Sequence, residues 1–288
     1  MKVAGLYFLA DHTPATLPNL TSSLLKKPSA SPLPRWSLEH RLLRAPPPPQ
    51  PVAAASTDPK LLPHQHILSL SHHPGKTYLY IPASTTTDAA TSGASAGSGT
   101  GSGSGAASGA GASGGATPGP VVAIPAAQAE PFVALLTSKQ SALWTHRQTH
   151  SVRDGAAFQV GECIVRAGEV RMPRPSSGGQ HVAQGVVVCI ETELLGGEEG
   201  EEEDAEVAVE GDVVMGEGDG DGDGGEKGVG VEAMREARET IRGLWKDLGV
   251  EGGKEGVKEV MSNYAGAEEE QARWAEVRMW CEVLRLRA

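Results

Sequence analysis

The segment between residues 143 and 195 constrains the fold most, because it has the pattern of consecutive β-strands. Apolar and polar side chains alternate over 143–150 and 156–166, and the run from Gly185 to Ile190 is almost continuously apolar. Alternation is typical of a half-buried strand, and a continuous apolar run is typical of a strand buried on both faces. Tight turns at Asp154-Gly155 and Ala167-Gly168 would separate the first strands, and short turns imply antiparallel pairing.

Further strands are expected on both sides of this segment. They cover residues 1–10, 36–43, 61–82 as a hairpin turning at His73-Pro74-Gly75, and 121–124. Residues 13–34 have the composition of a loop with one helical turn near 20–25, whereas helices are predicted over 127–138, 231–248 and 255–287. The expected fold class is therefore mostly β with flanking helices (α+β). A sheet of seven or eight antiparallel strands protects its edges by closing, so we expect a β-barrel covered by the C-terminal helices.

Three segments have a composition unlike the rest. Residues 45–60 contain four consecutive prolines, Pro46 to Pro49, 84–118 are almost entirely Ser, Gly, Ala and Thr, and 196–228 hold 14 of the 36 acids and one of the 25 bases. Such compositions cannot bury enough apolar surface to offset the entropy of ordering them. We expect one β-barrel domain over 1–288 with disordered insertions at about 45–60, 84–118 and 196–228, and with helices in 231–288 packed on the barrel. The two ends of 84–118 should then lie near each other or be joined by a long tether.

Charge and cysteine content exclude several classes of protein. Outside 196–228 the chain carries 22 acids and 24 bases, so no strongly basic face is expected, and direct nucleic-acid binding is disfavoured. No segment approaches the roughly 20 apolar residues of a membrane-spanning helix, so no membrane partner is expected. The three cysteines, Cys163, Cys189 and Cys281, are far apart and form no C-x-x-C pair. They are expected to be buried free thiols in a reducing compartment.

Three motifs resemble metal or cofactor sites but lack essential residues. The run from Asp219 to Gly224 begins like an EF-hand loop, but the position of the bidentate Glu is Gly230. The Gly-x-Gly repeats of 93–115 lack the lysine and the flanking strand and helix of a phosphate-binding loop. The histidine cluster, His64, His66, His72 and His73, contains no cysteine, and a strand would point His72 and His73 to opposite faces. We expect a polar cluster near a turn, and no metal or cofactor.

Polar residues in the central strands leave one enzymatic alternative open. Tunnel-type triphosphatases hold a metal with several acids pointing into a barrel, and Glu162, Glu191 and Glu193 are too few for this. An outer polar face or a protein interface is the preferred interpretation. Four or more acids in the lumen would revive the phosphohydrolase, and an open sheet edge would favour a third possibility, a peptide-binding β-module.

Several blocks together resemble subunit 20 of the Mediator complex. The main block runs from Trp144 to Gly168, with a Trp- and Arg-containing strand followed by a hairpin, and the apolar strand Gly185 to Glu191 comes after it. The blocks Gly5 to Phe8 and Trp36 to His40 are similar to the N-terminal part of the family, and the segments around Trp245 and Trp280 to its C-terminal helices. The resemblance covers about 1–44, 64–82, 121–195 and 231–288. The insertions fall in connections and have the composition of a fungal-type expansion.

The resemblance implies a non-enzymatic nuclear protein without cofactors. It implies an antiparallel β-barrel that forms a heterodimer with Mediator subunit 18, which has a related barrel. It also implies a tether to the head module through the C-terminal part of subunit 8, contacts with other head-module subunits, and a role in relaying signals from DNA-bound activators to RNA polymerase II. The residues expected in the interface or in the core are Trp144, Arg147, Phe158, Arg166 and Trp280, and plain core packing is the alternative for the tryptophans.

Overall fold

The computed structural model describes residues 2–46, 63–83, 119–138, 144–174, 181–193, 226–249, 256–262 and 268–285. The strands in these ranges are β1 (Lys2–Leu9), β2 (Ala30–Arg44), β3 (His64–Leu70), β4 (Lys76–Tyr80), β5 (Val121–Pro125), β6 (Thr145–Val160), β7 (Cys163–Pro173), β8 (His181–Glu193) and β9 (Val257–Met261). The helices are α1 (Thr16–Leu25), α2 (Ala126–Thr137), α3 (Glu226–Asp247) and α4 (Glu269–Arg285). The expected insertion 84–118 and most of 45–60 and 196–228 lie outside the described residues, as do the EF-hand-like run and the Gly-x-Gly repeats.

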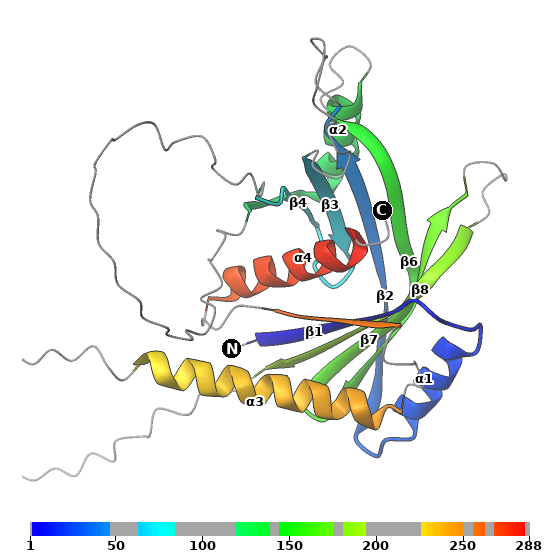
Figure 1. Cartoon of the computed structure of the whole chain (residues 1–288), viewed down its shortest axis with the longest axis vertical. Coiled ribbons are helices and arrows are strands. Elements are labelled where there is room, and N and C mark those ends of the chain that lie inside the picture. Colours follow the sequence, from blue (N-terminus) through cyan, green and yellow to red (C-terminus); the bar gives the residue numbers. More distant parts are fainter. Residues whose placement is uncertain are drawn as a thin grey trace, which may run out of the picture.

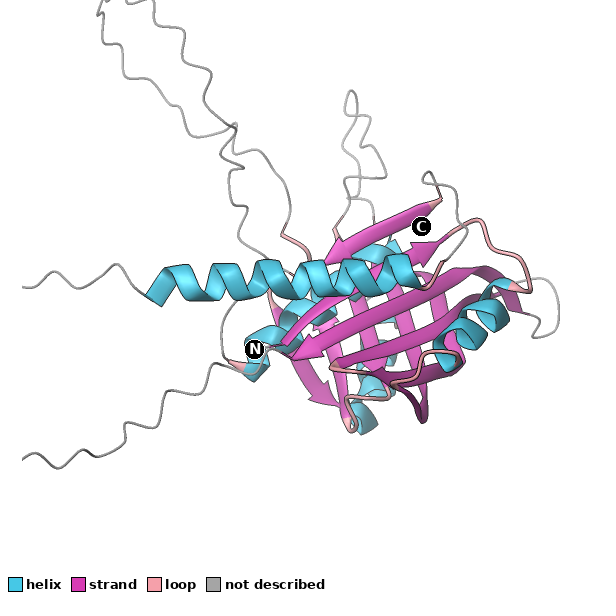
Figure 2. Ribbon diagram, turned by 90° about the horizontal axis from the view of Figure 1, so that it is seen from below, coloured by secondary structure: helices cyan, strands magenta, loops and turns pink. Residues whose placement is uncertain are grey.

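All nine strands belong to one antiparallel sheet, in the order β5-β4-β3-β2-β6-β7-β8-β1-β9 (Figures 1 and 2). The long strands β2 and β6 pair along most of their length and connect the two parts of the sheet. Register shifts interrupt their pairing near Trp36 and Leu42, and such bulges increase the local twist of a strand. The sheet therefore bends strongly, and the expected mostly-β fold with flanking helices is confirmed.

The expected closed barrel is wrong. Strands β5 and β9 are the two ends of the strand order, and the described residues form no pairing between them. Instead, α4 contacts β5, β4, β3 and β2 on one side and β1 and β9 on the other, so the sheet bends around this helix (Figure 1). A helix is about 10 Å across with its side chains, and it fills the space in which the two edges would otherwise meet.

Alternate side chains of the central strands form two apolar layers. On β1, Leu6 and Phe8 belong to the layer beneath α4, whereas Val3, Tyr7 and Leu9 belong to the layer beneath α1 and α3. On β8, Val187 and Cys189 face α4, and Val186, Val188 and Ile190 face the other way. The run from Gly185 to Ile190 is thus buried on both faces, as its sequence predicts.

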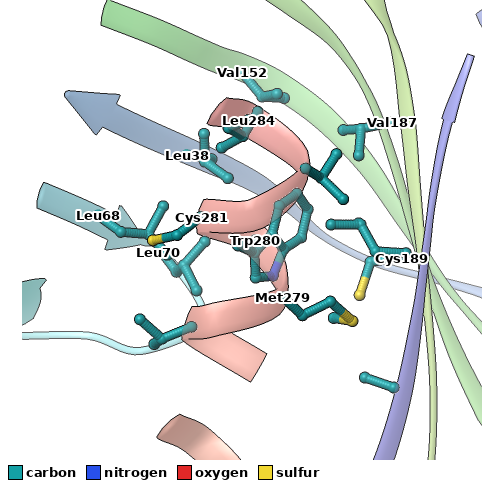
Figure 3. Packing of buried hydrophobic residues seen from close by; sticks show 14 of the residues in the cluster. Leu38, Leu68, Leu70, Val152, Val187, Cys189, Met279, Trp280, Cys281 and Leu284 are labelled. Carbon is teal, nitrogen blue, oxygen red and sulfur yellow. The ribbon is translucent and has the colours of Figure 1, made fainter. Parts of the chain in front are cut away.

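Trp280 of α4 is the centre of the first layer. Its ring is fully buried and is surrounded by apolar side chains of the sheet and of α4, including Leu38, Val187 and Cys189 (Figure 3). The ring of Trp36 lies beside it, with 5.7 Å between the ring centroids. The contact between α4 and the sheet therefore depends on a pair of tryptophans.

The two glycine turns predicted at Asp154-Gly155 and Ala167-Gly168 are wrong. β6 continues through Gly155 with a local register shift, β7 continues through Gly168, and the chain turns between them at Gly161, whose φ is 57°. The glycines serve another purpose, because a Cβ on Gly155 would lie 2.2 Å from Nε1 of Trp36 and a Cβ on Gly168 would lie 3.2 Å from its ring. The Trp36 indole N–H lies within hydrogen-bonding distance of the carbonyl oxygens of Ala156 and Ala167, at 3.1 and 3.2 Å.

Two further predictions need correction, and two are confirmed. The first part of the helix predicted over 255–287 is strand β9, and the loop predicted over 13–34 contains the ten-residue helix α1. The hairpin in 61–82 is confirmed as β3 and β4, with Gly75 at a φ of 74° in its turn. The three cysteines are buried and free, as expected.

The ends of two segments outside the described residues are close together. The backbone N–H of Ala45 donates to the carbonyl of Pro63 at 3.0 Å, and that of Ile81 donates to the carbonyl of Pro120 at 3.5 Å. Residues 47–62 therefore join the paired strands β2 and β3, and 84–118 join β4 and β5. Of the two alternatives expected for 84–118, neighbouring ends or a long tether, the first is the one observed. Among the helices that the structure describes, none has the length and apolar character needed to cross a membrane.

Candidate functional site

A buried ion-pair network joins three strands beneath α4. Glu191 of β8 is almost fully buried and forms ion pairs with Arg166 of β7 and with Lys2 of β1, whose Nζ lies 2.9 Å from its Oε2. Burial alone would lower the pKa of Arg166 and of Lys2, but the attraction of Glu191 outweighs it and raises both pKa values. The charges are thus satisfied internally, and the network has the character of a structural element.

Three buried histidines form a second polar cluster on the same face of the sheet. His40 of β2 lies opposite His150 of β6, with their rings stacked at 6.0 Å between centroids, and its Nε2 lies 2.9 Å from Nδ1 of His66 of β3. Burial, supplemented by the neighbouring imidazoles, lowers the pKa of His40 well below its usual value, and burial lowers those of His66 and His150 to about 3 and about 4. The cluster is therefore neutral in the folded protein at neutral pH.

The β3–β4 turn brings His72 and His73 to one carboxylate. The Nε2 of His72 lies 2.9 Å from Oε1 of Glu276, and the Nε2 of His73 lies 3.3 Å from its Oε2. The prediction that these two rings point to opposite faces of a strand is wrong, because both residues lie in the turn that follows β3. The four histidines that the sequence suggested as one cluster are divided, since His66 lies with His40 and His150 instead.

Exposed large apolar side chains gather at one end of the sheet. Four are exposed in the described part of the chain, and three of them, Ile81, Val122 and Leu135, belong to the β4–β5–α2 unit, which we define as residues 76–81 and 121–137. The fourth, Leu25, ends α1 at the other end of β2 (Figure 1). Strand β5 is paired with β4 alone within the described ranges, so its outer edge can accept another strand.

A cavity runs along α4 where the barrel is not closed. Its volume is about 440 Å³, and it lies between the end of β4, at Tyr80 and Pro82, and Val260 and Met261 of β9. Arg278 and Glu282 of α4 also line it. The unclosed sheet thus offers an open edge at β5 and, separately, a cavity between β4, α4 and β9.

The five residues predicted for the interface or the core do not form one site. Phe158 is buried in the layer beneath α1 and α3, whereas Arg166 and Trp280 are buried on the α4 side. Trp144 is half-buried and packs on the cluster around Leu136 of α2, and Arg147 is exposed on β6. An interface role for Trp144 and Arg147 stays a prediction. Val122 and Leu135 are not among the predicted site residues, although the adjacent apolar residues of 135–136 indicate that α2 cannot bury all of its apolar side chains.

The arrangement of acids does not match a tunnel-type triphosphatase. Two acidic side chains are buried among the described residues, Glu191 and Glu276. Glu191 is paired with Arg166 and Lys2, and Glu276 comes from α4 and not from a strand. The space where such a site would lie holds α4 itself, so this part of the chain lacks the four acids that the phosphohydrolase requires.

These features define an α+β protein with one open antiparallel sheet bent around a helix. A family model described as the TATA-binding related factor (TRF) of subunit 20 of the Mediator complex (Med20) matches residues 1–273. The chain therefore belongs to the Mediator subunit 20 family, as the sequence resemblance suggested. A chain of a solved structure titled "Structure of the Schizosaccharomyces pombe Mediator head module" is similar at 12% identity, with 91% of this chain and 100% of that chain covered and a TM-score of 0.37. None of the curated proteins matches the sequence.

Proposed function

We propose that the chain is a non-enzymatic scaffold subunit of the Mediator complex that acts in the nucleus by binding other subunits. The family match over residues 1–273 carries this proposal. In detail, the chain pairs with subunit 18, is tethered to the head module through the C-terminal part of subunit 8, and helps relay regulatory signals to RNA polymerase II. The internally paired charges of the α4 side support a structural role for the buried polar residues.

The β4–β5–α2 unit is the surface that we propose for docking. Stable interfaces bury about 1,200–2,000 Å² in total around a few apolar anchors. Val122 is 52% exposed in β5, which is an edge strand of the described sheet, and Leu135 is 65% exposed in α2, which follows β5. A partner that covers this end of the sheet would bury both side chains and extend the hydrogen bonding of β5.

Substitution of the exposed apolar residues tests this surface. We expect Val122→Asp and Leu135→Asp each to weaken binding to a co-expressed pair of subunit 18 and the C-terminal part of subunit 8 by roughly tenfold or more, since burying an unpaired charge is costly. Leu25→Asp is the matched control, because Leu25 is 59% exposed on α1 and outside the unit. Calorimetry should find the same affinity for the Leu25→Asp variant as for the unaltered chain. If all three variants weaken binding equally, the β4–β5–α2 unit is not the docking surface.

Purification of the chain from native nuclei tests the assignment as a whole. Mediator subunits should co-purify with it, and their absence would contradict the proposed function. A peptide-binding β-module is the second candidate, and the open edge of β5 favours it. In that case an extended peptide would bind the chain without any folded subunit. It would also compete with the partners whose binding the Val122→Asp substitution weakens.

A further inference from the structure

We propose that His72, His73 and Glu276 form a binding site for one zinc ion, or a similar divalent transition metal, that links α4 to the β3–β4 hairpin. The two histidines come from the turn between β3 and β4, and the glutamate comes from the second turn of α4, about 200 residues further along the chain. A metal at this point would cross-link two elements that otherwise meet through side-chain packing. This site is independent of the proposed docking function.

The ligand atoms converge at separations that suit a zinc ion. The Nε2 atoms of His72 and His73 lie 2.9 and 3.3 Å from the two oxygens of Glu276, and the two imidazole rings are 4.6 Å apart between centroids. Zinc binds imidazole nitrogen and carboxylate oxygen at about 2.0–2.2 Å, so neighbouring ligands of a tetrahedral ion lie roughly 3.3 Å apart. Imidazole and carboxylate together are a known donor set for zinc.

The charge balance of the site also favours a cation. The side chain of Glu276 is 5% exposed, and those of His72 and His73 are 12% and 10% exposed. Apart from the two imidazoles, Glu276 accepts from the indole N–H of Trp280 at 3.3 Å, whereas the nearby Arg166 and Lys2 bond to Glu191 instead. A buried carboxylate is costly unless a positive charge compensates it, and a bound divalent ion provides that charge.

Three protein ligands leave one coordination position for water or for another ligand. His73 also lines a cavity of about 620 Å³ together with Lys76 and Arg153, which provides a route for the ion. The Nδ1 atoms of both histidines are buried without a hydrogen-bond partner in the described part of the chain. A hydrogen bond from Nδ1 usually orients an imidazole that binds a metal through Nε2, and both histidines lack it among the described residues. We therefore expect a micromolar affinity for zinc, weaker than that of a closed structural zinc site.

A second group of possible ligands, His40, His66 and Cys281, is less suited to a metal. All three side chains are completely buried, although His66 and Cys281 also line the cavity of about 440 Å³ along α4. Burial raises the pKa of the Cys281 thiol far above its usual value, which disfavours the thiolate that zinc requires. Only the second cluster contains a cysteine. A metal bound there would have a sulfur ligand, which distinguishes it from a metal bound by His72, His73 and Glu276.

Metal titration of the purified full chain tests the proposal. After dialysis against a chelator, calorimetry should detect one zinc ion bound with micromolar affinity. At a free zinc concentration 100 times the dissociation constant, the unfolding equilibrium constant should fall about 100-fold, measured by denaturant unfolding. Bound Co²⁺ should give a visible spectrum of nitrogen and oxygen ligands without a sulfur charge-transfer band.

Matched variants locate the metal. His73→Gln, His72→Gln and Glu276→Gln should each weaken zinc binding at least about tenfold, while His146→Gln, at an exposed histidine of β6, and Cys281→Ser should not. His73→Gln is the decisive variant, because its ring is at the edge of the cavity and its loss should leave the circular dichroism unchanged. Three results would each overturn the proposal. The unaltered chain could fail to bind zinc, both histidine variants could bind it as tightly as the unaltered chain, or the Co²⁺ spectrum could contain a sulfur charge-transfer band that disappears in Cys281→Ser.

Discussion

At the scale of single residues, the ring of Trp36 explains two glycines that the sequence suggests are turns. The indole lies across β6 and β7, where Gly155 and Gly168 leave room for it, and its N–H lies between two carbonyl oxygens. A glycine beside an aspartate is the usual signature of a hairpin turn, so local sequence gives the wrong answer here. The ring that requires the glycine is more than 100 residues away, and no local pattern indicates it.

We expect Gly168→Ala to destabilise the protein by about 1–3 kcal/mol. The added Cβ would lie 2.5 Å from Cγ1 of Val152 and 3.2 Å from the ring of Trp36, and overpacking of this kind forces side chains out of their rotamers. Gly243→Ala is the control, because a Cβ there meets nothing within 4 Å and alanine favours the helix α3. Denaturant unfolding should give opposite signs for the two variants, and a Gly168→Ala protein as stable as the unaltered chain would show that this position has room for a Cβ.

The buried histidines predict a loss of stability in mild acid. The pKa values of His66 and His150 are lowered in the folded state to about 3 and about 4, whereas in the unfolded chain they are near 6.5. Between these values the unfolded state binds more protons, so stability is fully present above about pH 6.5 and is lost as the pH falls. From pH 7.5 to pH 5 the loss should be about 2 kcal/mol for each of the two histidines.

The predicted loss of stability can be checked with the His150→Phe variant. Its free energy of unfolding and that of the unaltered chain are measured at pH 7.5 and at pH 5. The substitution keeps an aromatic ring beside His40 and removes one titrating group, so the pH dependence should shrink by about 2 kcal/mol. An unchanged pH dependence would mean that His150 titrates normally in the folded protein.

At the scale of secondary-structure elements, tertiary contacts decide where local pattern is ambiguous. Val257, Val260 and Met261 have helical spacing, which is why a helix is predicted there, but pairing with β1 makes the segment strand β9. The serines, threonines and Pro18 of α1 have the composition of a loop, but the segment is a helix whose Leu20 and Leu24 are buried. The strongly patterned elements, β1, β3, β4, β8 and α2, could be predicted from the sequence. The buried ion-pair network and the histidine clusters could not be predicted, because their residues come from distant elements whose register and packing the sequence does not specify.

The ion-pair network across β1, β7 and β8 should matter more than the ion pairs at the surface. We expect Glu191→Gln to destabilise the protein by about 3–5 kcal/mol, because it leaves Arg166 charged and buried without its partner. Glu169→Gln, which removes a partner of the half-exposed Arg171 on β7, should cost less than about 1 kcal/mol. Chemical denaturation of both variants compares them directly, and similar costs would mean that Glu191 is not essential to the core.

At the scale of the whole molecule, the sheet stays open because a helix fills its centre. The number and antiparallel pairing of the strands suggested a closed barrel, but strand counts do not indicate whether a helix will lie inside the curve. Two of the three segments of unusual composition, 45–60 and 84–118, join strands that are paired with each other in the sheet. β4 and β5 are paired up to Tyr80 and Val121, on either side of 84–118.

Replacing residues 84–118 with a four-residue turn should therefore leave the fold intact. The flanking residues Ile81 and Pro120 are already hydrogen-bonded, so a short connection can close the hairpin, and a shorter loop costs slightly less entropy. Thermal unfolding should give a melting temperature equal to or slightly above that of the full chain, with partner binding unchanged. A large drop in melting temperature would contradict the interpretation of 84–118 as an insertion. Deleting 196–228 should likewise leave stability and pairing intact.

The position of β1 between β8 and β9 has a consequence for synthesis on the ribosome. Strand β1 leaves the ribosome before either of its two partners, so it cannot pair until residues 181–193 and then 257–261 have been translated. At roughly 5–20 residues per second, its apolar side chains stay unprotected for on the order of tens of seconds. A nascent chain stalled before β8 should therefore be cleaved readily by protease within β1, and one stalled well after α4 should resist. We therefore expect newly made chains to need protection by chaperones until β8 has been translated.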